Sequence, residues 1–132
     1  MTGDELLEAA RKAANRAYAP YTKFRVGAAV LADGRLFSGC NIENASVGLT
    51  VCAERTAIFG AVSSGRRCLE AIAVSCIDVG ADAPRGGRMP CGACRQVIAE
   101  FAEPSTPVHI DGVGTCTVAD LLPQPFTLKY AG

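Results

Sequence analysis

The sequence contains no tryptophan, only 6% aromatic residues and a single histidine. Any Ser-His-Asp hydrolase would have to rely on His109, which is more simply a structural residue of a short strand. The chain also lacks net charge, because thirteen basic residues offset thirteen acidic ones, and most affinity for polyanions comes from positive charge. No segment approaches the roughly 20 apolar residues that span a bilayer. We therefore expect neither nucleic acid nor membrane as a partner.

The first ten residues, MTGDELLEAA, include acids and no apolar segment, so we expect no secretory signal. Seven cysteines are present, and an odd number does not pair off into a disulfide framework. Both features favour a cytoplasmic protein, in which thiols serve as core residues, nucleophiles or metal ligands.

The length of 132 residues suits one domain over residues 1–132, and no linker or repeat divides it. Hydrophobic periodicity predicts a helix over 4–18, then strands over 24–32 and 35–42 joined by the turn signal Asp33-Gly34. Further helices are expected at 50–62 and 90–102, with Thr50 as N-cap and Pro90 in a first turn, strands at 71–77 and 108–111, and a helical turn at 118–122. This order predicts an α/β fold, a three-layer α/β/α sandwich with a mixed sheet of about five strands.

Two cysteine motifs, Cys52-Ala53-Glu54 and Pro90-Cys91-Gly92-Ala93-Cys94, lie at expected helix N-termini, where the helix dipole favours thiolates. Three thiolates can converge on one Zn²⁺ and leave its fourth position to water, as catalytic zinc sites do. Glu54 is then placed to exchange protons with that water. Arg55 follows it and could hydrogen-bond to the thiolates and offset their charge.

Other interpretations of these cysteines stay open. A Cys-x-x-Cys pair is also typical of redox proteins, and a structural zinc site could be closed by Cys40 or Cys76. The cysteines outside the motifs are more simply core residues: Cys40, Cys68, Cys76 and Cys116.

The motifs Cys-Ala-Glu-Arg and Pro-Cys-Gly-Ala-Cys-Arg-Gln resemble those of the small, homotetrameric, zinc-dependent cytidine deaminases. The resemblance extends over nearly the whole chain, through residues 19–29, 41–44 and Leu121-Leu122-Pro123 followed by Phe126. In zinc deaminases as a class, a zinc-activated water attacks C4 of cytosine and a glutamate moves the protons.

The resemblance implies hydrolytic deamination of cytidine and deoxycytidine to uridine and deoxyuridine, a step of pyrimidine salvage, with one Zn²⁺ per subunit of a homotetramer. It assigns zinc binding to Cys52, Cys91 and Cys94, and the proton shuttle to Glu54. It assigns substrate binding to Asn41 and Glu43 at the ribose 3′-hydroxyl, Phe24 against the nucleoside, the Ala53 N–H at the pyrimidine carbonyl, and Phe126 at a neighbouring subunit's pyrimidine.

One position departs from the family, because Val47 lies where a tyrosine is common. That change leaves the contact with the 5′-hydroxyl, and the breadth of substrates, open. Two alternatives therefore accompany the main interpretation: a deaminase of a related aminopyrimidine nucleoside of the antibiotic type, and a binding module with structural zinc and no catalysis.

Overall fold

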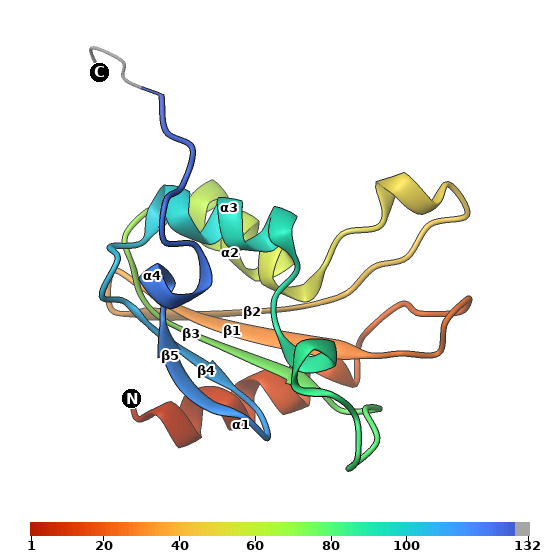
Figure 1. Ribbon diagram of the computed structural model, residues 1–132. Helices are drawn as coiled ribbons and strands as arrows, with labels where there is room; N and C mark the ends of the chain where they lie inside the picture. The colour runs from red at the N-terminus through yellow and green to blue at the C-terminus, as the bar shows by residue number, and fades with distance from the viewer. Residues whose placement is uncertain (129–132) are drawn as a thin grey trace.

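The computed structural model describes residues 1–128 and has one five-stranded sheet with helices on both faces (Figure 1). The strands are β1 (Val26–Ala32), β2 (Arg35–Cys40), β3 (Leu69–Cys76), β4 (Pro107–Ile110) and β5 (Gly114–Thr117), and the helices are α1 (Gly3–Ala14), α2 (Ala53–Ser63), α3 (Gly92–Phe101) and α4 (Val118–Leu121), with short 3₁₀ turns η1 (Val47–Leu49) and η2 (Arg85–Arg88). The strand order is β2-β1-β3-β4-β5; β3 and β4 pair in parallel and the other neighbours pair antiparallel. The expected mixed sheet in an α/β/α sandwich is confirmed.

Each face of the sheet has its own core, because successive strand residues point to opposite sides. On one face, α1 buries Leu6 and Ala10 against Ala29 of β1 and Ala73 of β3. On the other face, α2 and α3 pack over Val30 of β1 and the neighbouring strands. Figure 1 shows α1 alone below the sheet and α2, α3 and α4 above it.

Two glycines in the opening hairpin bring both helical layers very close to the sheet. A Cβ on Gly27 of β1 would lie 1.8 Å from the carbonyl oxygen of Ala10, in α1. A Cβ on Gly39 of β2 would lie 2.5 Å from the amide nitrogen of Ala57, in α2. The absence of a side chain at these positions therefore allows α1 and α2 to pack closely against the hairpin, each on its own face.

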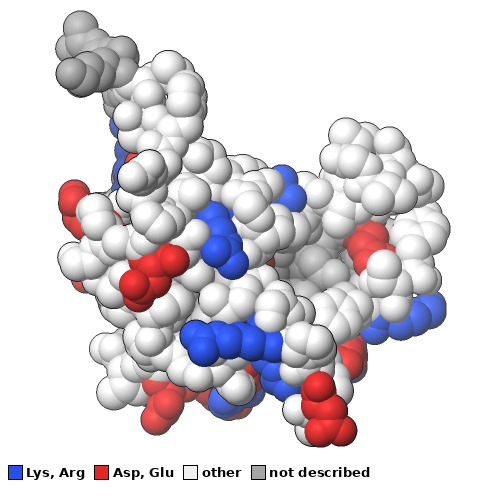
Figure 2. All heavy atoms as spheres, viewed as in Figure 1, with Lys and Arg blue, Asp and Glu red and all other residues white. Residues whose placement is uncertain are grey.

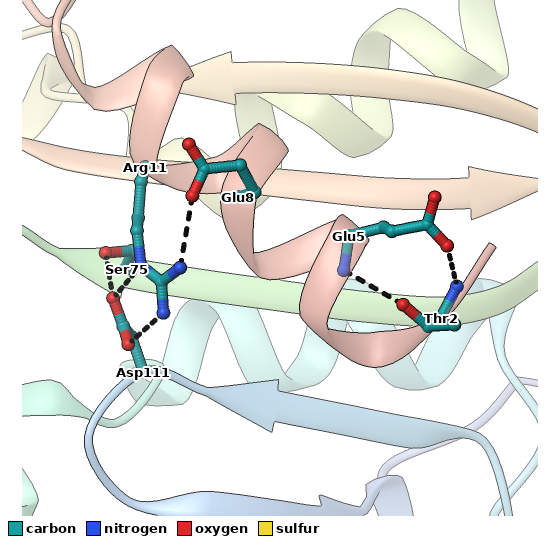
Figure 3. A network of polar contacts seen from close by, with 6 residues as sticks. All are labelled: Thr2, Glu5, Glu8, Arg11, Ser75 and Asp111. Atoms are coloured by element: carbon teal, nitrogen blue, oxygen red, sulfur yellow. Dashed lines mark hydrogen bonds and ion pairs between the residues drawn. The ribbon is translucent and has the colours of Figure 1, made fainter.

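A polar network ties α1 to β3 and to the residue that follows β4 (Figure 3). The Arg11 guanidinium donates to both Asp111 oxygens, at 2.9 Å each, and the Ser75 hydroxyl donates to the same carboxylate at 2.7 Å. Arg11 first, and then Ser75, hold the pKa of Asp111 below its usual value. At its other end α1 is closed by a capping box between Thr2 and Glu5.

The expected helix over 4–18 is too long, because α1 ends at Ala14. The residues after it leave the helix so that Tyr18 can join the chain beyond β2. Its N–H donates to the Asn41 carbonyl at 3.0 Å, and its carbonyl accepts from the Glu43 N–H at 2.8 Å. A tertiary pairing has therefore replaced the last helical turn.

Two expected helix starts were also wrong, and the sequence did not predict strand β5. Cys52 and Cys91 are the N-caps, in place of a cap at Thr50 and a start at Pro90. β5 follows a turn at Gly112, whose φ of +78° a residue with a side chain rarely adopts. Within residues 1–128, no helix is both long and apolar enough to cross a membrane.

Candidate active site

Three cysteine sulfurs meet where α2 and α3 begin. The Sγ atoms of Cys52, Cys91 and Cys94 all lie within 4.8 Å of one another, with Cys52 3.8 Å from Cys91 and Cys91 3.4 Å from Cys94. Tetrahedral zinc with thiolates at 2.3 Å sets its sulfurs about 3.8 Å apart. The donors and their spacing therefore fit Zn²⁺.

This cluster offers three ligand atoms to a metal, one from each cysteine. Among residues 1–128, no further histidine, cysteine or carboxylate joins it, so a structural site closed by Cys40 or Cys76 is wrong. Structural zinc sites are usually closed by four protein ligands, whereas catalytic sites keep one position for water. The ligand set is therefore that of a catalytic site.

Both N-cap cysteines have extended backbones, with φ and ψ of −72° and 157° at Cys52 and −69° and 168° at Cys91, and neither side chain makes a capping hydrogen bond. Their sulfurs are thus left for the metal. The helix dipoles and unpaired N–H groups at these ends favour negative sulfur. This local geometry explains why two separate helix starts supply the ligands.

Hydrogen bonds distribute charge among the thiols. The Cys94 thiol, and then the Arg55 guanidinium, lower the pKa of Cys52 to about 5. The pKa of Cys94 is raised, first because it hydrogen-bonds to Cys52 and then because it is buried. Arg55 Nη2 lies 3.4 Å from Cys52 Sγ, which confirms the expected contact, and its buried Nε has no partner in the described chain. A metal that binds here must displace the remaining protons.

Glu54 is buried beside these sulfurs, with 4% of its surface exposed. Burial, and then the negative charge of Cys52, raise its pKa to about 7. A carboxyl with a pKa near neutrality both accepts and releases protons at physiological pH. The side chain therefore has the protonation behaviour of a general acid and base.

A cavity of about 190 Å³ opens in front of Glu54. Its walls include residues expected from the sequence, namely Phe24, Asn41, Cys52, Ala53, Glu54 and Cys91. It is mostly apolar with a few polar groups, as small-molecule sites commonly are. Cys94 does not line the cavity and is fully buried.

Half of the residues that line the cavity were not predicted from the sequence as site residues, namely Val26, Thr50, Val74, Cys76, Gly87 and Met89. Strand alternation carried a signal for part of it: Val74 and Cys76 share one face of β3, and Ser75 between them turns to Asp111 on the other. Burial raises the pKa of Cys76 to about 11, so this thiol stays protonated.

Asn41 holds the segment that carries Phe24. Its Oδ1 accepts from the Val26 N–H and its Nδ2 donates to the Phe24 carbonyl, both at 2.8 Å. Lys23, immediately before Phe24, has a φ of 61°, in the left-handed region that residues with side chains disfavour. The Asn41 contacts and those of Glu43 keep this strained turn in place.

Glu43 is also buried, but it lies outside the 190 Å³ cavity. Its carboxylate accepts from the Tyr21 N–H at 3.0 Å, and from the Thr22 N–H at 3.2 Å and hydroxyl. The Thr22 hydroxyl contributes most to lowering the pKa of Glu43. Glu43 lines a neighbouring cavity of about 270 Å³ together with Val47, and Thr50 borders both cavities.

The remaining expected residues fall outside the cavity. Phe126 is 68% exposed and touches the chain through its carbonyl, which accepts from Gln96 Nε2 at 2.9 Å. His109 pairs with Thr115 across β4 and β5 at 2.8 Å, as a structural residue does. Cys68 is exposed, so its expected place in the core is wrong.

The charges on the visible face are mixed, with basic and acidic side chains interspersed (Figure 2). Figure 2 also shows that face hollowed beside the projecting segment that carries η1. The picture agrees with the equal numbers of basic and acidic residues in the sequence.

Residues 2–110 match the family model described as the cytidine and deoxycytidylate deaminase zinc-binding region. A cytidine deaminase of Sporosarcina psychrophila is 49% identical over 99% of this chain and 98% of its own length. The crystal structure of a cytidine deaminase from Burkholderia pseudomallei superposes with a TM-score of 0.83 at 47% identity, covering 96% of this chain and 100% of that one. A blasticidin-S deaminase of Bacillus cereus is 33% identical over 93% of this chain and 91% of its own.

Proposed function

Because the chain belongs to the cytidine and deoxycytidylate deaminase zinc-binding family, we propose that it hydrolyses cytidine and deoxycytidine to uridine and deoxyuridine, with release of ammonia. The observation that carries this proposal is the cavity that brings Glu54 beside two of the three cysteine ligands. Cys52, Cys91 and Cys94 would hold Zn²⁺, and the bound ion would act as a Lewis acid that brings the pKa of water close to neutrality.

Glu54 moves the protons of the reaction. It takes a proton from the attacking water and passes it to ring N3, and then takes the proton of the added hydroxyl and passes it to the departing amine. Its raised pKa, about 7, supports both directions of transfer. Burial also keeps bulk water from competing for the carboxyl group, because only 4% of the residue is exposed.

The substrate is oriented by groups that already face the cavity. Ala53 is the first residue of α2, where backbone N–H groups lack a partner within the helix, and its N–H is free to hold the pyrimidine carbonyl. Phe24 supplies an apolar wall for the nucleoside. Asn41, in the wall of this cavity, and Glu43, in the neighbouring cavity of about 270 Å³, are assigned to the ribose 3′-hydroxyl, and both also fix the turn before β1.

Arg55 offsets the negative charge of the thiolates. Three thiolates around Zn²⁺ would give the centre a net negative charge, which would weaken the effect of the ion on its water. The guanidinium at 3.4 Å from Cys52 withdraws part of that charge. The Arg55→Gln variant should therefore keep zinc and lose rate, whereas Arg55→Lys should retain more of the rate.

The active assembly is a homotetramer in the cytoplasm. Phe126 is exposed and does not line the cavity of its own chain, which suits a role at a neighbouring subunit's pyrimidine. Large apolar side chains near the second cavity are exposed as well, including Ile42, Val47 and Leu49. Contact between subunits would cover them.

A second candidate is deamination of a related aminopyrimidine nucleoside such as blasticidin S. It is favoured by the 33% identity with a blasticidin-S deaminase and by the exposed valine at position 47. The 49% identity with a cytidine deaminase favours the first candidate. A binding module with structural zinc is disfavoured by the three-ligand group and the buried glutamate beside it.

An ultraviolet assay of cytidine loss tests the proposal, run with the purified protein and again after treatment with a chelator. Loss of absorbance with release of ammonia, abolished by the chelator and restored by Zn²⁺, is expected. Blasticidin S assayed in parallel separates the two substrates. A zinc-loaded protein that leaves cytidine and deoxycytidine unchanged would contradict the proposal.

A further inference from the structure

The helix that carries two of the thiols also carries two side chains that reach away from the cavity. Arg95 and Gln96 follow Cys94 directly in α3, and both are partly buried. Neither lines the 190 Å³ cavity, so the chemistry described above leaves them without a role.

Arg95 forms hydrogen bonds with the turn that carries Cys91. Its Nε donates to the carbonyl of Pro90 at 2.8 Å, and its backbone N–H donates to the carbonyl of Cys91 at 3.0 Å. Pro90 is buried, so its carbonyl depends on a protein donor. A hydrogen bond from a guanidinium is about twice as strong as one between neutral groups. The peptide before the ligand is thereby fixed from the same helix.

The same guanidinium holds the end of α4. Arg95 Nη1 donates to the carbonyl of Leu121 at 2.9 Å, which is the last residue of that short helix. Gln96 Nε2 then donates to the carbonyl of Phe126 at 2.9 Å. Two consecutive side chains of the ligand helix therefore hold both ends of the segment 121–126.

We infer that Arg95 and Gln96 form a clasp that fixes the metal-binding turn and the C-terminal segment 121–126 relative to each other. Arg95 is the positioning residue for the Cys91 ligand and anchors the start of the segment. Gln96 anchors its end, where Phe126 is displayed. The inference rests on the zinc site of the proposed function and is independent of which substrate is turned over.

Metal retention tests the first half of the clasp. Arg95→Lys keeps the charge but loses the planar fork that reaches two carbonyls. Zinc release to a chromogenic chelator should be about tenfold faster or more, as for other residues that orient metal ligands. The thiolate-to-metal bands of the cobalt-substituted protein should shift as well. Arg85→Lys, at an exposed position in η2, is the matched control and should behave as wild type.

Hydrogen exchange of the backbone amides in 121–128 tests the second half. Gln96→Ala should speed this exchange, whereas Gln124→Ala, an exposed glutamine in the same segment, should not. Because coupling is reciprocal, removal of zinc from the wild-type protein should speed it too.

Three results would overturn the inference. One is wild-type zinc release and an unshifted cobalt spectrum in Arg95→Lys, even with a lowered melting temperature, since a purely structural role predicts that combination. The others are an exchange rate insensitive to zinc removal, or equal effects of Gln96→Ala and Gln124→Ala. A zinc-loaded protein inactive on cytidine would contradict the proposed function and leave the clasp standing.

Discussion

The chemistry depends on the surroundings of single residues more than on their identity. An exposed glutamate would stay ionised near neutrality, whereas burial next to Cys52 raises the pKa of Glu54 to about 7. Three of the seven cysteines converge on one point, while Cys76 lines the cavity with its pKa raised to about 11 and remains a thiol. The surroundings of each residue therefore decide whether it binds metal, carries protons or stays an unreactive thiol.

Replacing Glu54 with glutamine should remove catalysis without removing the metal. The amide has nearly the same shape but cannot take or give the proton, so kcat should fall by at least about 10²–10⁴-fold. Zinc content, measured by atomic absorption, should stay at one per chain. Glu100→Gln, at an exposed position of α3, should keep both activity and metal. A Glu54→Gln protein with wild-type turnover would contradict the assigned proton shuttle.

At the scale of elements, the turn before β1 is held from two sides. Asn41 and Glu43 hold it from the chain beyond β2. Asp78, after β3, accepts from the Arg25 guanidinium at 2.8 and 2.9 Å and from its backbone N–H at 2.8 Å. These contacts set the place of Phe24 in the cavity, because they fix the residues on either side of it.

The Arg25–Asp78 pair should give stability a dependence on acid pH. Its hydrogen bonds lower the pKa of Asp78 from 3.8 to about 2, so the carboxylate stabilises the fold above its unfolded pKa. This contribution should decrease from about pH 4 and be lost as the pH falls through about 2. Urea unfolding should show Asp78→Asn less stable than wild type near pH 6, with the difference much reduced near pH 2.

Asp82→Asn, at an exposed position nearby, is the control and should match wild type throughout. A difference between wild type and Asp78→Asn that persisted unchanged to pH 2 would show that the charge of Asp78 is not what stabilises the turn.

Gly27→Ala should be strongly destabilising. The added Cβ would meet backbone of α1 at 1.8 Å, which no side-chain adjustment relieves. We expect a loss of about 3 kcal/mol in the free energy of unfolding, or failure to fold. Gly60→Ala, in α2 with nothing near its Cβ, should instead be neutral or stabilising by up to about 1 kcal/mol. Chemical denaturation compares the two, and equal stabilities would contradict the close packing of α1 on β1.

Much of this element-scale picture follows from the sequence, and its gaps have physical causes. Periodicity and turn chemistry predicted the opening hairpin and the helices, and two cysteine motifs predicted the metal cluster. Periodicity could not reveal that α1 stops at Ala14, because a long-range pairing of Tyr18 ends it. The cavity wall from Gly87 and Met89 was equally hidden, since it depends on how the loop after β3 folds.

At the scale of the whole molecule, the metal site joins α2 to α3 and should stabilise the fold. Bound zinc adds its binding free energy to folding, since the unfolded chain offers no such site. Chelation should therefore lower the melting temperature of the wild-type protein and have no effect on Cys94→Ala, which should bind no zinc. Cys116→Ala, outside the cluster, should keep the metal-dependent shift. Stoichiometric zinc in Cys94→Ala would remove that residue from the ligand set.

The central claim is a zinc ion held by three sulfurs with one coordination position open beside Glu54. X-ray absorption at the zinc edge counts the sulfur ligands of the purified protein directly. We predict three sulfurs near 2.3 Å and one oxygen or nitrogen ligand near 2.0 Å that exchanges when a substrate analogue binds. Four sulfurs, or a fourth ligand that no analogue displaces, would contradict the account.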